Sequence, residues 1–205
     1  MDECDQERDT KKFLKNKNIL VIQKMGTIGG AEKNLEKIMD FFSRRHHWNF
    51  LILGPGKGPF FDRIISDRFP WIGVKIPDWR KGVNFLLRYF YVLKQMYLLK
   101  GHKLDLIYVN DFFYAPYGFY LSKMKKIPCI VHVQSDIEIK RVHQYSIDKI
   151  DGVIVTTRST FERIKSFFDN SPNRKLFLIQ YGTELKNILK KTKRASCKTP
   201  GLCCA

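Results

Sequence analysis

Small and polar residues follow most of the predicted strands of this 205-residue sequence, at the point where each strand ends. These positions are Gly29 and Gly30, Asn110 and Asp111, Gln134 to Asp136, Thr156 and Thr157, and Gly182 to Glu184. The carboxyl ends of parallel strands meet at one edge of a sheet, and that edge is where such sheets bind ligands. The pattern therefore predicts a binding edge for a polar ligand, although it identifies no catalytic residue.

The first of these positions lies in a strand, glycine turn and helix over residues 19–42. Gly29 and Gly30 precede a run with apolar residues at helical spacing, which places Glu32 on the outer face with Lys33. A helix N-terminus presents unpaired N–H groups and a partial positive charge, and glycine lets an anionic ligand approach the backbone. The alternative is that both glycines only permit tight packing of strand against helix.

Two nucleotide-binding motifs do not match the glycine turns of this sequence, so no cofactor is predicted. The glycine spacing G-x-x-G-G differs from the dinucleotide fingerprint, and no acidic residue ends the second strand at 50–53. The turn at residues 56–58 lacks the hydroxyl residue of an ATPase phosphate loop. NAD and ATP are therefore not expected ligands.

Seven apolar runs alternate with six helical segments along the chain. Strands are predicted over residues 19–22, 50–53, 71–76, 104–109, 127–133, 152–155 and 176–179. Helices are predicted over residues 31–42, 60–69, 83–100, 113–123, 139–150 and 159–168, the last opened by a capping box from Ser159 to Glu162. This order predicts an α/β fold, a Rossmann-like parallel sheet with helices on both faces.

Composition divides the chain into three parts. Residues 1–17 are polar and are expected to be disordered, and residues 18–185 are expected to form the domain. Residues 186–205 form a basic tail poor in apolar side chains, also expected to be disordered.

The formal net charge of +17 favours anionic partners such as a lipid surface or phosphates. Nucleic acid is not expected, because the basic residues are scattered and no nucleic-acid motif is present. The segment 83–100 is apolar and basic with no acidic residue. It is expected either to lie on an anionic bilayer or to cover the sheet as a core helix.

Five cysteines show no zinc-site spacing, so no metal is predicted. The charged N-terminus has no signal-peptide pattern, and no run of 18 apolar residues occurs. We expect a reduced, cytoplasmic protein, with a peripheral position at the inner face of a membrane as an option.

Four segments resemble the family 4 glycosyltransferases of GT-B fold. They are GGAE at Gly29–Glu32, residues 105–136, residues 151–164, and the strand with YGTE at residues 176–184. The resemblance runs in order over about residues 18–185. It implies that this chain is the N-terminal, acceptor-binding half of such an enzyme. The whole enzyme would transfer a sugar from a nucleotide-sugar donor to a hydroxyl of a glycan or lipid-linked acceptor.

The resemblance also implies roles for particular residues. Gly29 and Gly30 would contact the donor diphosphate or the acceptor through the backbone. Asn110 and Gly182 are expected at the substrate edge from the strand-end pattern described above. The family often has a histidine where this chain has Gln134. His132, two residues earlier and on the same side of the strand by alternation, is expected either to replace that histidine or to be satisfied within the fold.

The family's donor domain carries paired glutamates, and no such pair follows Glu184 here. We therefore expect a truncated enzyme or one completed by a second chain, with little activity from this chain alone. The alternative is a non-catalytic binding module for an anionic glycolipid or membrane surface.

Overall fold

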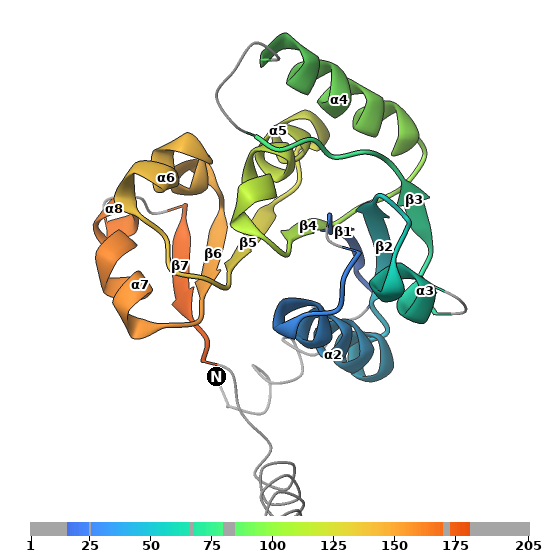
Figure 1. Cartoon of the computed structure of the whole chain (residues 1–205), viewed down its shortest axis with the longest axis horizontal. Helices are drawn as coiled ribbons and strands as arrows, with labels where there is room; N and C mark the ends of the chain where they lie inside the picture. Colours follow the sequence, from blue (N-terminus) through green and yellow to red (C-terminus); the bar gives the residue numbers. More distant parts are fainter. Residues whose placement is uncertain (1–15, 25, 66–67, 80–84, 170–172, 181–205) are drawn as a thin grey trace, which may run out of the picture.

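The computed structural model describes residues 16–24, 26–65, 68–79, 85–169 and 173–180. Seven parallel strands form one sheet in the order β3-β2-β1-β4-β5-β6-β7 (Figure 1). The strands are β1 (Asn18–Ile22), β2 (Asn49–Gly54), β3 (Trp71–Gly73), β4 (Leu106–Val109), β5 (Cys129–Val133), β6 (Gly152–Val155) and β7 (Lys175–Leu178). The predicted α/β Rossmann-like fold is confirmed.

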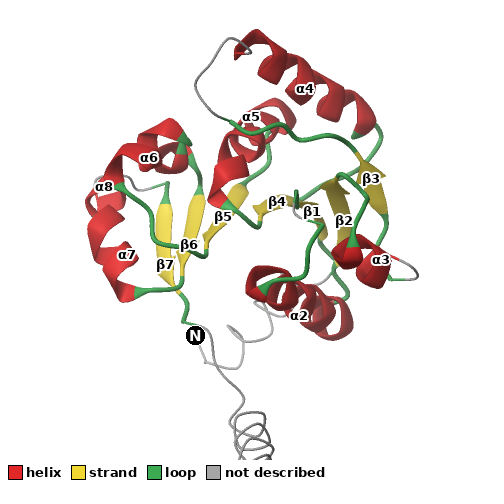
Figure 2. Cartoon of the chain, in the orientation of Figure 1, coloured by secondary structure: helices red, strands yellow, loops and turns green. Residues whose placement is uncertain are grey.

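Helices cover the sheet on both faces (Figure 2). They are α2 (Gly30–His46), α3 (Pro59–Ile65), α4 (Phe85–Leu98), α5 (Ala115–Lys125), α6 (Ile139–Gln144), α7 (Arg158–Ile164) and α8 (Ser166–Asp169), with 3-10 turns η1 (Phe112–Tyr114) and η2 (Ile147–Lys149). The α2 and α3 helices lie on one face, whereas α4 to α8 lie on the other. This two-sided cover explains why the strands are apolar runs rather than alternating ones.

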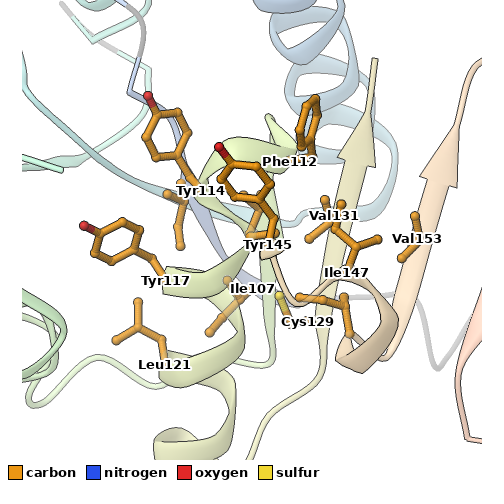
Figure 3. Close-up of a cluster of buried hydrophobic side chains, with 14 of the residues drawn as sticks. Ile107, Phe112, Tyr114, Tyr117, Leu121, Cys129, Val131, Tyr145, Ile147 and Val153 are labelled. Atoms are coloured by element: carbon orange, nitrogen blue, oxygen red, sulfur yellow. The ribbon is translucent and has the colours of Figure 1, made fainter. Parts of the chain in front are cut away.

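The larger core lies between the sheet and the α4–α8 layer. Figure 3 shows part of it, with Tyr117 and Leu121 on α5 close to buried Ile107, Cys129 and other strand residues. The smaller core lies beneath α2 and α3 and contains side chains that alternate with the first set along β1, β2, β4, β5 and β6.

Two predicted elements are much shorter than expected. The strand predicted over residues 71–76 stops at Gly73, because β2, which it pairs with, ends at Gly54. The helix predicted over residues 139–150 stops at Gln144, because Ser146 has φ 54°, a left-handed conformation that ends an α-helix. The helix predicted over residues 159–168 is divided into α7 and α8, and the other predicted helices and strands are present with shifted ends.

The predicted cap of the α7 helix is also wrong. Thr157, not Ser159, is its N-cap, and the Thr157 hydroxyl accepts a hydrogen bond from the Thr160 backbone N–H at 3.3 Å. Both residues are of a type that commonly caps helices. Thr157 is the cap because β6 ends only two residues before it, so the helix begins earlier than predicted.

The α5 helix packs closely on the sheet at Gly118. A Cβ atom at this position would lie 2.4 Å from Cγ2 of Val109 and 2.9 Å from Sγ of Cys129. Gly30, at the start of α2, differs because no atom lies within 4 Å of the place its Cβ would occupy. Of these two helical glycines, only Gly118 is therefore required by packing.

We predict that Gly118→Ala lowers the free energy of unfolding by about 1–3 kcal/mol, because the added methyl group must displace β4 and β5 side chains. Gly30→Ala, the matched control, should leave stability unchanged or raise it by up to ~1 kcal/mol through helix propensity. Chemical denaturation of both variants measures the difference. Equal effects would show that α5 does not pack as closely as described.

Candidate functional site

A pocket opens where the winding of the sheet changes direction. From β1 the chain continues to β2 on one side, whereas β4 leads to β5 on the other. The loops after β1 and β4 therefore diverge, and this is the usual ligand crevice of such sheets. The pocket has a volume of about 430 Å³, and its walls are the first turn of α2 and the loops after β1, β4 and β5.

A chain of hydrogen bonds joins these walls. The Glu32 carboxylate accepts from the Gly29 backbone N–H at 2.9 Å and from Gln23 Nε2 at 3.0 Å. Gln23 Oε1 accepts from Asn110 Nδ2 at 2.8 Å, and Asn110 Oδ1 accepts from Gln134 Nε2 at 2.8 Å. Because Gln23, Glu32 and Asn110 are buried, these bonds fix the loops relative to one another.

The glycines of the first loop differ in whether the fold leaves room for a side chain. A Cβ at Gly26 would lie 2.1 Å from the Lys57 carbonyl oxygen, so this glycine lets the loop pack against the next one. A Cβ at Gly29 would lie 2.9 Å from the Glu32 carboxylate. Gly30 lines the pocket, and nothing in the described fold requires the absence of its side chain.

A second set of interacting polar side chains lies at the rim of this pocket. Lys24 forms an ion pair with Asp78, and the Tyr114 hydroxyl donates to the same carboxylate at 3.1 Å. Burial raises the pKa of Asp111, the Phe113 N–H opposes this rise, and the negative charge of Glu32 adds to it. Asp111 therefore binds a proton more readily than an exposed aspartate.

The charges of the pocket favour hydroxyl groups over phosphate. Its described lining contains one lysine, Lys24, and two carboxylates, Glu32 and Asp111. The Glu32 carboxylate already faces the N-terminus of α2, where an anion would otherwise be stabilised. The remaining polar lining consists of four amides and two hydroxyls, from Gln23, Asn34, Asn110, Gln134, Ser135 and Tyr114. Such groups donate to and accept from sugar hydroxyls.

His132 lies away from this pocket. It lines a mostly apolar hollow of about 460 Å³ between α2 and the neighbouring strands, where its Nδ1 atom is 2.6 Å from the Tyr108 hydroxyl oxygen. Burial lowers the pKa of His132 to about 4, so the ring is neutral near pH 7. Asn34 on α2 lines both hollows, and Gln134 lines only the polar one.

The structure thus brings together Gly30, Asn110 and Gln134 at one pocket, with Gly29 as the cap of the adjoining helix. Gly182 lies outside the described residues. The role of these five residues in substrate binding remains a prediction.

The sequence did not lead us to predict two residues of the hydrogen-bond chain, Glu32 and Gln23. Glu32 was expected on the outer face of its helix, and this was wrong, because it is buried and turned back to the Gly29 N–H. Gln23 directly follows β1, so the rule that selected Asn110 would also have selected it.

In the ranges that the structure describes, no three His, Cys, Asp or Glu side chains gather as a metal-ligand set would. Across those same ranges, no helix has both the length and the apolar character needed to cross a membrane.

No protein-family model matches the sequence, and no curated protein matches it. Three similar solved structures are HepE from Anabaena in complex with UDP and glucose, a glycosyltransferase from Rickettsia africae, and a piece of sucrose-phosphate synthase from Thermosynechococcus elongatus. Their identities are 18%, 10% and 14%, and their TM-scores are 0.60, 0.62 and 0.54. The matches cover 88%, 90% and 87% of this chain, and 50%, 51% and 97% of the respective structures.

The chain spans about half the length of the two glycosyltransferases. At these identities the likeness concerns the fold. The sheet and its helices match one half of a GT-B glycosyltransferase.

We predict that Glu32→Ala lowers the free energy of unfolding by about 2–3 kcal/mol, because it leaves the buried Gln23 amide and the Gly29 N–H without their shared acceptor. Glu36→Ala removes the same type of side chain one turn later and should cost about 0.5 kcal/mol or less. Urea unfolding of both variants makes the comparison. A similar loss in both would mean that the cap contact contributes little.

A second prediction concerns the pH dependence of stability. The folded-state pKa of His132 lies below its ordinary value of about 6.5. Between these two values the unfolded chain binds more protons than the folded chain, so stability should fall as the pH falls from about 6.5 to about 4. The full difference corresponds to about 3 kcal/mol.

Unfolding curves measured across this pH range test the assignment. His132→Gln should remove most of this fall, whereas His102→Gln, at an exposed histidine, should keep it. An unchanged profile in the His132→Gln variant would contradict the burial of a neutral ring.

Proposed function

We propose that this chain is the acceptor-binding half of a GT-B glycosyltransferase of the family 4 kind. The complete enzyme transfers a sugar from a nucleotide sugar to a hydroxyl of a glycan or lipid-linked acceptor. The observation that carries the proposal is the polar pocket at the direction change of the sheet, within a fold that matches one half of such enzymes. HepE, one of the similar structures, was solved with UDP and glucose, which supports a nucleotide-sugar donor.

The pocket chemistry supports the acceptor side. An acceptor presents hydroxyl groups, and the amides and carboxylates of the lining match them. A donor diphosphate carries negative charge and would meet Glu32 and Asp111 with Lys24 as the cation of the described lining. We therefore assign the diphosphate mainly to a second domain, whether joined to this chain or supplied by another one.

The positions of the resembling segments also support the proposal. GGAE forms the cap and first turn of α2, and residues 105–136 contribute β4, α5, β5 and the loops that begin at Asn110 and Gln134. Both segments therefore lie at the pocket. Gly30 leaves open space there, which permits a ligand to approach the helix backbone.

Saturation-transfer NMR on the full chain tests the proposal with a panel of methyl glycosides and with UDP. We expect weak binding of at least one glycoside, and weaker binding of UDP. Asn34→Ala combined with Ser135→Ala should reduce glycoside binding about tenfold, because both side chains line the pocket outside the buried network. Asn49→Ala, at the start of β2, is the control and should bind as the parent chain does.

Three outcomes would count against the proposal. Tight binding of UDP alone would move the donor site to this half. Robust sugar transfer by the purified chain would show that it needs no second domain. Failure of every glycoside to bind would favour a non-catalytic binding module for an anionic surface.

A further inference from the structure

A buried arginine lies in the first turn of α4. Arg88 is only 8% exposed, and it is the fourth residue of a helix that begins at Phe85. Val92 and Leu99, on the same face of the helix, are buried in the larger core, as expected if this segment covers the sheet. A guanidinium is not deprotonated in proteins, so its burial cannot be relieved by the loss of a proton. The fold therefore holds a fixed positive charge on the inner face of α4.

The guanidinium has an aromatic contact but no anionic one. Its Cζ atom lies 5.4 Å from the centroid of the Trp79 ring, a cation–π contact. In the part of the chain that the structure describes, no carboxylate pairs with Arg88, and no oxygen accepts a hydrogen bond from its side chain. Asp78, the acidic residue next to Trp79, pairs with Lys24 and accepts from the Tyr114 hydroxyl. A buried cation without such a partner carries an uncompensated desolvation cost.

The aromatic side of this cluster is held in place by α5. The Trp79 ring meets Tyr117 edge-on, with ring centroids 5.1 Å apart, and its centroid lies 5.6 Å from that of Tyr120. The Tyr117 hydroxyl also donates to the Pro77 carbonyl oxygen at 2.8 Å, which anchors the segment that carries Trp79. Because Trp79 is fixed, the Arg88 guanidinium that stacks on it is held close to the body of the domain.

The start of α4 adds a second feature that favours an anion. The first four N–H groups of an α-helix, here residues 85–88, have no partner within the helix and carry a partial positive charge. A helical side chain leans toward the helix N-terminus, so the Arg88 charge lies at the same end of α4. The first turn has no acidic residue, and the sequence has none from residue 79 to residue 104. At α2, by contrast, the Glu32 carboxylate already occupies the helix terminus.

We propose that Arg88 and the first turn of α4 bind a phosphate group, either free or as a monoester. The planar guanidinium donates two parallel hydrogen bonds to such a group, and the N–H groups of the helix donate to its other oxygens. The site is separate from the polar pocket, whose lining does not include Arg88. The inference does not depend on the proposed sugar transfer.

Thermal unfolding of the full chain with added phosphate tests the proposal, and a ³¹P NMR titration measures the Kd. At constant ionic strength, about 20 mM phosphate should raise the Tm of the parent chain by about 3–7 °C, which corresponds to a Kd of about 1 mM. Arg88→Met keeps an unbranched side chain without the charge and should lose most of this shift. Arg88→Lys keeps the charge without the planar fork and should bind phosphate about tenfold more weakly.

Two variants of the same helix are the controls. Gln95→Met changes another buried side chain of the inner face, two turns further on, whose amide atoms have no hydrogen-bond partner among the described residues. Lys94→Met removes an exposed positive charge from α4. Both variants should keep the full phosphate shift. A loss in Lys94→Met equal to that in Arg88→Met would overturn the proposal, because the shift would then follow net charge.

Two further results would also overturn the proposal. One is an equal shift with acetate, which would show that the site does not select phosphate. The other is an Arg88→Met variant that unfolds well below the parent chain in phosphate-free buffer, because the guanidinium would then have a partner within the chain. We expect this variant to be at least as stable there, since it removes a buried charge. A larger shift with glycerol 3-phosphate than with phosphate would support a monoester as the ligand, and an equal shift would support the free anion.

Discussion

The buried carboxylate of Glu32 is the contact on which the candidate site depends. A buried charge is costly unless donors surround it, and here one donor comes from the cap of α2 and another from Gln23 after β1. These bonds hold the helix terminus against the end of the strand. Because the carboxylate also faces the positive end of the helix, it leaves a pocket suited to neutral hydroxyl groups rather than to an added anion.

Two aspartates stabilise the other end of the sheet in a similar way. Asp105 precedes β4 and accepts from the Asn18 N–H of β1 at 2.8 Å, and Asp151 precedes β6 and accepts from the Cys129 N–H of β5 at 2.9 Å. Each carboxylate therefore satisfies the first amide of a neighbouring strand. Both aspartates begin segments that resemble the glycosyltransferase family, so those segments carry fold information as well as site information.

The two hollows beside α2 differ in chemistry because they lie at different heights on the same sheet. The one at the carboxyl edge collects amides and carboxylates from loops, where side chains are not confined to the two faces of a strand. The one lower on the face collects strand side chains, which are apolar apart from Tyr108 and His132. His132 is consequently held neutral in apolar surroundings, with its ring nitrogen satisfied by the Tyr108 hydroxyl.

The sequence alone determined the alternation of strands and helices, and with it the parallel sheet and the clustering of Asn110 and Gln134 at one edge. These follow from local periodicity and from a general property of parallel sheets. Only the tertiary structure decided that Glu32 turns inward, that Gln23 links it to Asn110, and that His132 faces an apolar hollow. Such contacts join residues distant in the chain or depend on a backbone N–H, and side-chain spacing along one segment encodes neither.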